Sequence, residues 1–111
     1  MRKVTTVVVL LLATGVAGWL THGLWQNYKR NAAFTQTRVG DKEQDVISRF
    51  GAPDHRESSD KPYSLYTGVA CTPPCQTRLW WEDSLLPGIS AWSVELGTDR
   101  RVVKTTRWSS P

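Results

Sequence analysis

The sequence predicts an α+β protein in which an N-terminal transmembrane or signal helix precedes one small domain. Three observations indicate this: a long apolar segment at the N terminus, a short helical pattern around residue 45, and three alternating apolar segments after residue 77. The chain has 111 residues, so about 70 to 75 remain for the folded unit. A hydrophobic core of that size supplies only a few kcal/mol, and six tryptophans and a cysteine pair are available to support it.

The N-terminal segment is long enough to cross a membrane. Residues 4–28 contain no formally charged side chain, and His22 is their one residue whose ordinary pKa lies near neutral pH. As a helix, the apolar run of residues 4–20 is about 26 Å long, and extension to Trp25 gives about 33 Å. Because the apolar core of a bilayer is ~30 Å thick, residues 1–28 are expected to form a membrane anchor or a signal segment.

The flanks of this segment favour a permanent anchor. Basic residues precede the run, and aromatic residues followed by basic ones come where it would leave the membrane; these residues are Arg2, Lys3, Trp19, Trp25, Tyr28, Lys29 and Arg30. The alternative is a signal peptide cut after Ala17, since Gly15 and Ala17 have the spacing of a cleavage site. The first interpretation predicts a single-pass inner-membrane protein with its C-terminal domain in the periplasm, and the second a soluble periplasmic one.

Beyond the anchor, residues 29–36 are expected to form a linker or first helix, and residues 37–111 the domain. The net charge of +4 does not predict nucleic-acid binding there. Two of the basic residues precede the apolar run, and the others are scattered among acidic residues, singly or as pairs. Such a distribution is typical of a solvated surface, whereas nucleic-acid binding proteins gather basic residues along one face.

The two cysteines are expected to form a disulfide. Cys71 and Cys75 flank Thr-Pro-Pro, and a disulfide is the usual state of such a pair in an oxidising compartment. A continuous polyproline helix would hold their Cα atoms about 12 Å apart. A disulfide tolerates no more than roughly 7 Å, so the loop must bend, by a turn or by a cis bond before Pro73 or Pro74.

The same pair leaves a second interpretation open, as a thiol-redox centre or a copper site. Copper-delivery proteins use a Cys-x-x-x-Cys spacing but need a third ligand, typically histidine. His22 lies inside the apolar segment and His55 lies far upstream of the cysteines. We therefore expect a structural disulfide, no metal site and no cofactor.

Residues 41–53 predict a short helix with both ends marked. Asp41 suits the N-cap, and Gln44 can complete a capping box. Val46, Ile47 and Phe50 form one apolar stripe that would face a core. At the other end, a glycine and then a proline end the helix; these are Gly51 and Pro53.

Residues 39–54 resemble the BamE/SmpA family, accessory lipoproteins of the outer-membrane β-barrel assembly machinery. The motif is met at Val39, Gly40, Asp41, Val46, Phe50, Gly51 and Pro53, and RLWWE and AWSVELGTDRRVV fit the family's later strands more loosely. The resemblance implies two short helices packed on a three-stranded antiparallel sheet. It also implies an accessory role in envelope assembly. The chain differs from the family in having no lipid-attachment cysteine near residues 15–22.

Three segments near the C terminus predict an antiparallel meander. Residues 78–83 and 92–96 alternate between apolar and other positions, a type II turn fits Pro87-Gly88, and residues 102–108 form the last strand. The side chains expected in the core are Leu79, Trp81, Trp92, Val94 and Leu96. Because the faces of a strand alternate, Trp80 is expected to point away from this core.

Two interpretations of the remaining aromatic residues follow. In one, the first helix or the segment from Tyr63 to Tyr66 covers them. In the other, they form an exposed patch that binds a partner, with Trp80, Trp108, Arg78 and Arg107 as its residues.

No catalytic pattern stands out. We find no nucleophile–base pair, metal-ligand cluster or glycine-rich phosphate loop, and Asp54-His55 reads as a solvated loop. The sequence thus predicts a non-enzymatic envelope accessory or scaffold protein. It would contact membrane lipid through its N-terminal segment and bind a protein or lipid partner, with no nucleic acid and no small-molecule substrate. The alternatives are the thiol-redox or copper-handling protein and a secreted, inhibitor-like binding module.

Overall fold

The computed structural model describes residues 1–58, 61, 63, 66–67, 69 and 71–109. The elements in chain order are α1 (Arg2–Gln36), α2 (Glu43–Phe50), β1 (His55–Ser58), β2 (Thr77–Glu82), β3 (Ser90–Leu96) and β4 (Val102–Ser109). The predicted α+β class is confirmed. The expected pair of short helices on three strands is wrong, because α1 has 35 residues and the sheet has four strands.

The sheet is an antiparallel meander in the order β1-β2-β3-β4. Its first strand was not predicted, because His-Arg-Glu-Ser contains no apolar residue and so shows no alternation. The interpretation of Asp54-His55 as a solvated loop is wrong for His55. This residue pairs with Trp80 across the strands, and its ring stacks on Tyr63 with centroids 4.2 Å apart.

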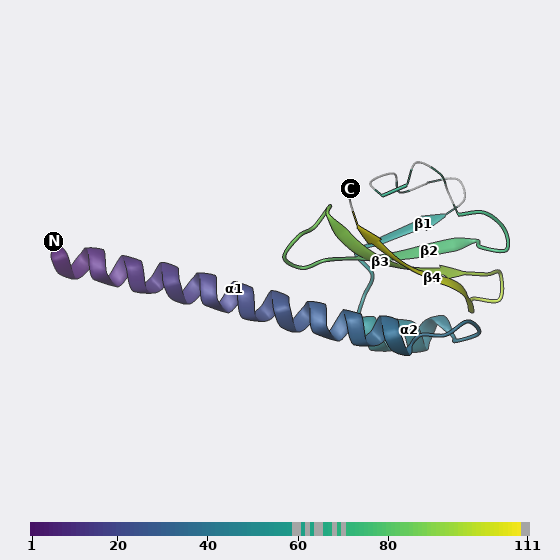
Figure 1. Ribbon diagram of the computed structural model, residues 1–111, viewed down its shortest axis with the longest axis horizontal. Helices are drawn as coiled ribbons and strands as arrows, with labels where there is room; N and C mark the ends of the chain where they lie inside the picture. Colours follow the sequence, from purple (N-terminus) through teal and green to yellow (C-terminus); the bar gives the residue numbers. More distant parts are fainter. Residues whose placement is uncertain (59–60, 62, 64–65, 68, 70, 110–111) are drawn as a thin grey trace.

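Both faces of the sheet are covered (Figure 1). The helices lie on one face, over a core that contains every predicted core residue; its members are Ala33, Val46, Phe50, Leu79, Trp81, Trp92, Val94, Leu96 and Val102. On the other face, Tyr63 and Tyr66 from the connection between β1 and β2 pack on Trp80. All seven residues of β3 are buried, as expected of a strand covered on both faces.

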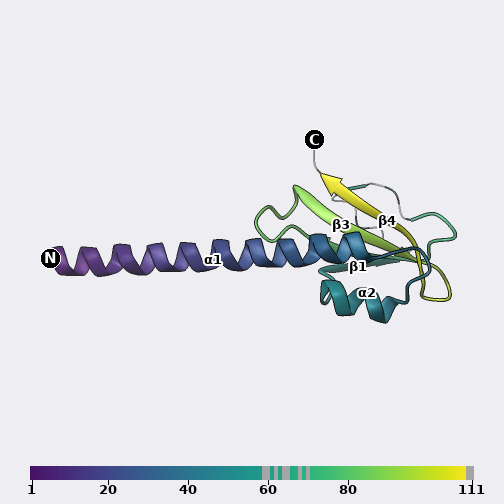
Figure 2. The ribbon, with the colours of Figure 1, turned by 60° about the horizontal axis from the view of Figure 1, so that its bottom comes forward.

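Helix α1 runs without a break from the apolar segment into the domain. Residues 29–36 are its last turns and form no separate linker, and Ala33 and Phe34 pack in or against the core. Its apolar part projects from the domain, as Figures 1 and 2 show, and is long and apolar enough to cross a membrane. A signal sequence has the same features.

Helix α2 presents Val46 and Phe50 to the core, as predicted. The expected cap at Asp41 is wrong, because the helix begins at Glu43 with Lys42 at its N-cap and no side-chain cap. The Asp41 carbonyl oxygen instead accepts from Val102 N at 2.9 Å, which ties this stretch to β4 and draws residue 41 away from the helix end.

Candidate functional site

The first candidate site is the junction where α1 meets the β2–β3 loop. Asn27, half-buried on α1, uses both ends of its amide. Its Nδ2 donates to Asp83 Oδ1 at 2.9 Å, and its Oδ1 accepts from Ser84 N at 2.8 Å. Since Asp83 is itself buried, the amide fixes the loop to the helix at a point shielded from water.

One turn further along α1, Arg30 makes a second attachment. Its guanidinium donates to the carbonyl oxygen of Glu82 at the end of β2 and lies 3.3 Å from the Asp54 carboxylate. Asp54 in turn accepts from Glu82 N at 2.8 Å. The end of α1 is therefore bound to the rim of the sheet by a network of charged and amide groups as well as by apolar packing.

A second cluster lies under the β1–β2 connection and is centred on Glu57. This carboxylate is 1% exposed and accepts from Arg78 Nη1 at 2.7 Å, Trp80 Nε1 at 2.9 Å and Tyr63 N at 2.7 Å. A buried carboxylate is stable only when it is paired and hydrogen-bonded, as this one is. Glu57 thus holds the connection onto the sheet.

The predicted partner-binding patch is not exposed as expected. Trp80 is 0% exposed and Arg78 is 7% exposed, because Tyr63 and Tyr66 pack on Trp80 with centroids 5.5 and 5.3 Å away. The interpretation in which these tyrosines cover the ring is confirmed; residues 64 and 65 of that segment lie outside the described residues. The Tyr63 hydroxyl donates to Glu82 Oε1 at 2.7 Å. Burial, followed by this hydrogen bond to a carboxylate, raises the pKa of the Tyr63 hydroxyl, so the group keeps its proton and stays a donor.

The other two patch residues lie on opposite faces of β4. Trp108 is half-buried on the face of Trp80, 5.4 Å from its ring, and donates from Nε1 to Ser93 Oγ at 2.7 Å. Arg107 lies over the Trp92 ring at 4.3 Å, on the helix face. The structure therefore brings Arg78, Trp80 and Trp108 together and leaves Arg107 apart.

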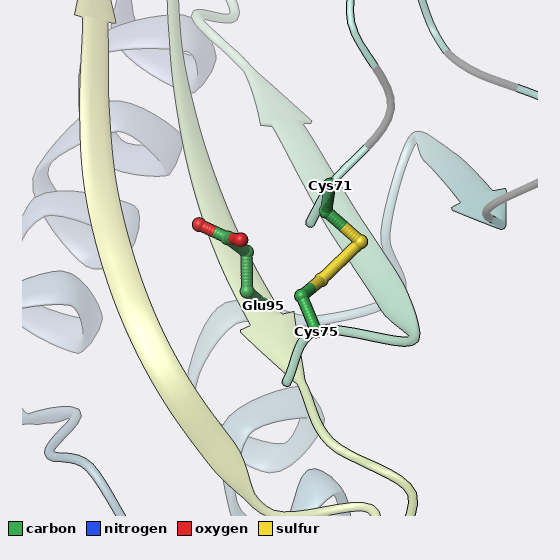
Figure 3. Close-up of side chains that lie close together, drawn as sticks. All are labelled: Cys71, Cys75 and Glu95. Atoms are coloured by element: carbon green, nitrogen blue, oxygen red, sulfur yellow. A yellow bond between two sulfur atoms is a disulfide. The ribbon is translucent and has the colours of Figure 1, made fainter. Parts of the chain in front are cut away.

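The cysteine loop has the bend that the sequence requires. Cys71 and Cys75 are joined by a disulfide with their Cα atoms 5.7 Å apart, and the Pro73-Pro74 bond is cis. Glu95 lies beside them on β3 (Figure 3), and the two sulfur atoms and a carboxylate oxygen lie within 4.8 Å of one another. While the sulfurs are bonded to each other they are not thiolate ligands, so this group serves as a structural clamp.

A third charged cluster fastens α2 to the β3–β4 turn. Glu43 accepts from Arg100 Nε at 2.6 Å and from Arg56 Nη1 at 2.8 Å. The hydrogen bond from Arg100, followed by that from Arg56, lowers the pKa of Glu43 despite its burial. Hydrogen bonds from Arg38 N and the Arg49 guanidinium likewise lower the pKa of Asp41.

Several residues of the motif at positions 39–53 have structural roles. Val46 and Phe50 are in the core, where Phe50 stacks on Trp81 at 4.2 Å, and Trp81 Nε1 donates to Gly51 O at 3.0 Å. Gly40 has a φ of +96°, which favours glycine, and donates from its N to Val102 O at 2.8 Å. Val39 is exposed and Pro53 is half-buried.

Sequence reasoning missed Asn27, Arg30 and Glu57, three polar residues that attach α1 and the β1–β2 connection to the sheet. Asn27 and Arg30 are polar residues at the end of an apolar helix, a pattern that does not reveal which loop they contact. Glu57 lies in a strand without alternation. Comparison of the chain with protein-family models, curated proteins and solved structures found no match.

Proposed function

We propose that this chain is a single-pass, non-enzymatic cell-envelope protein that acts as an accessory or scaffold at the outer surface of the inner membrane. The observation that carries the proposal is the unbroken course of α1, from an exposed apolar segment to core residue Ala33. A helix that continues into a packed core sets both the height and the orientation of the domain above the membrane. A flexible linker would set neither.

An uncleaved anchor is favoured by what cleavage would leave behind. A cut after Ala17 would retain Trp19, Leu20 and Leu24 on the remaining part of α1, all of them exposed. In water, this apolar surface would cost free energy at roughly 25 cal/mol per Å². In a bilayer it is the surface that lipid covers.

The periplasm is favoured by the cysteine loop. The disulfide between Cys71 and Cys75 closes a small ring beside Glu95 of β3. Such bonds persist in oxidising compartments. A copper site would need these sulfurs reduced to thiolates. Glu95, the third group near them, offers a carboxylate oxygen, which is a poor ligand for Cu(I).

Kinship with the BamE/SmpA family is part of the proposal and rests on residues 39–54. The roles of Val46, Phe50 and Gly51 in packing and helix termination support a shared structural motif. Because one fold serves many functions, this likeness supports an accessory role more than membership of any particular assembly.

We place the protein partner at the outer edge of β4. This strand is at the end of the sheet. Its first residue, Val102, exchanges backbone hydrogen bonds with Gly40 and Asp41, and after that residue the described part of the chain pairs β4 with β3 alone. Strand edges present backbone hydrogen-bonding groups that partner segments can use. Trp108, half-buried on β4, adds an aromatic contact within the same stretch.

Site-specific photo-crosslinking in intact cells tests this surface. A crosslinkable residue in place of Lys104, exposed on β4, should give one discrete adduct, whereas the same residue in place of Gln44, exposed on α2, should give none. Loss of the Lys104 adduct when Trp108 is changed to alanine would show that the crosslinked partner binds at this edge. Absence of an adduct at Lys104, or the same products at both positions, would contradict the proposed surface.

A further inference from the structure

The β2–β3 loop, residues 83–89, lies beside the apolar part of α1. Figures 1 and 2 show it as the part of the described domain that reaches furthest along α1 toward the N terminus. Contact is direct, because Leu85 Cδ2 occupies the space that a Cβ atom on Gly23 would need. The loop therefore packs against α1 at the level of Gly23.

That level is where α1 is expected to leave the bilayer. The helical rise from Val4 to Gly23 is about 29 Å, close to the ~30 Å thickness of the apolar core of a bilayer. Trp19 and Trp25 lie within two turns of Gly23 and are exposed. Aromatic residues gather at the membrane–water interface, so the loop lies at the depth of the interface.

The side chains of the loop suit that position. Its tip reads Ser-Leu-Leu-Pro-Gly-Ile and carries no charge. Leu86 is 51% exposed and Ile89 is 49% exposed, although both belong to a loop that is otherwise fastened to the domain. Two large, half-exposed aliphatic side chains at the height of the interface form a small apolar surface which lipid can cover.

The backbone of the loop needs no water to satisfy its donors. Every N–H from residue 83 to residue 90 donates within the protein: Asp83 to Ser90 O, Ser84 to Asn27 Oδ1, Leu85 and Leu86 to Asp83 Oδ1, Gly88 to the Tyr66 hydroxyl, and Ile89 and Ser90 to Leu86 O. Unpaired backbone groups are what make entry into an apolar phase costly. This loop can enter without breaking any of these bonds.

From this geometry we propose that residues 85–89 form a second membrane contact, in which Leu86 and Ile89 insert into the interfacial layer of the bilayer that α1 spans. This inference rests on the proposed transmembrane anchor. The contact needs no specific headgroup, because the inserted surface is uncharged. Together with α1 it restricts the tilt of the domain relative to the membrane surface, because a tilt would withdraw the loop from the bilayer or push it deeper.

Environment-sensitive labelling of the full chain tests the contact. The native cysteines are joined to each other, so one added cysteine can carry an NBD fluorophore on the oxidised protein. The protein is reconstituted in phosphatidylcholine vesicles with a spin-labelled lipid as quencher. Labels go at Leu86→Cys and Ile89→Cys, with Thr98→Cys, exposed in the β3–β4 turn at the far end of the sheet, as the aqueous control. Leu12→Cys, in the middle of the apolar segment, reports on the anchor.

We expect the labels at Leu86 and Ile89 to emit at shorter wavelength than the label at Thr98 and to lose intensity to the lipid-borne quencher. Quenching at Leu12, together with emission and quenching at Leu86 and Ile89 equal to those at Thr98, would overturn the loop contact and leave the anchor standing. A label at Leu12 that is not quenched would overturn the anchor itself, and the loop contact with it.

Discussion

The side chain of Asn27 donates to the carboxylate of Asp83 over 2.9 Å, although the two residues are 56 positions apart in the sequence. Asn27 belongs to the helix that carries the apolar segment, and Asp83 begins the loop between the two central strands. This bond is therefore one of those that join the helix carrying the apolar segment to the sheet.

Substitution of Asn27 by alanine is expected to loosen the junction. The change removes the group that donates to Asp83 and the group that accepts from the Ser84 N–H. The buried Asp83 carboxylate and the half-buried Ser84 N–H each lose this hydrogen bond. The expected cost is about 1–2 kcal/mol. Amide hydrogen exchange of the full chain in detergent micelles should show faster exchange at Ser84. Gln36→Ala, an exposed amide on the same helix, is the control, and equal exchange in both variants would contradict the role of Asn27.

A bulky residue at position 23 is expected to displace the β2–β3 loop. Gly23→Leu would drive its side chain into Leu85, whereas Gly18→Leu, the same change in the same helix, has nothing within 4 Å. Hydrogen exchange at Leu85 and Leu86 should therefore accelerate in the first variant alone. An unchanged rate in Gly23→Leu would mean that the loop does not pack on the helix.

The sequence predicted the parts of this fold whose conformation is determined by residues close together in the chain. The alternation of Trp92, Val94 and Leu96 identified β3 and the face that meets the helices, and the stripe of Val46 and Phe50 identified the core side of α2. The alternation did not show that the other face of β3 is buried as well. The need for a bend between Cys71 and Cys75 followed from chain geometry alone, and the structure has that bend.

The sequence failed where distant segments decide the outcome. Asp41 has the chemistry of a helix cap, but its backbone pairs with Val102, so the helix starts later. Trp80 does point away from the main core, as the alternation predicted, but Tyr63 and Tyr66 cover it from a connection with no regular pattern. Glu57 gave no indication of its role because its strand has no apolar residue. The sequence likewise gave no indication that Asn27 and Arg30 would bind the β2–β3 loop and the end of β2.

Loss of the buried charge at Glu57 is expected to destabilise the domain strongly. In Glu57→Gln, the amide retains one acceptor oxygen, and its NH₂ group must face one of the donors Arg78, Trp80 and Tyr63 N. Breaking a buried pair of this kind costs about 3–5 kcal/mol. Chemical denaturation measures it, with Asp99→Asn in the exposed β3–β4 turn as the matched acid-to-amide control. Equal stabilities would show that the cluster does not hold the connection in place.

Acid is expected to weaken the attachment of α2. The pKa of Glu43 is lowered from its ordinary value of 4.5 in the folded protein, chiefly by Arg100, so the unfolded chain binds the proton more readily. The resulting stabilisation is fully present above pH 4.5 and is lost as the pH falls through the folded pKa. Arg100 and Arg56 are largely exposed, so it amounts to less than about 1 kcal/mol.

The measurement is the free energy of unfolding between about pH 5 and about pH 3. In Glu43→Gln, the free energy of unfolding should decline less steeply as the pH falls. Asp45→Asn, which changes an exposed acid in the same helix, is the comparison. A decline as steep in Glu43→Gln as in the unmodified protein would contradict the role assigned to Glu43.

A chain anchored as proposed stays in the membrane while its two sulfur atoms face an oxidising space. The most direct measurement alkylates the thiols of intact cells with a mass-tagged maleimide, with and without prior reduction, and then follows the protein through carbonate extraction of the membranes. We predict that the protein remains in the membrane pellet, unlabelled at Cys71 and Cys75 until a reductant is added. Recovery in the soluble cytosolic fraction, with both cysteines labelled without reductant, would contradict it.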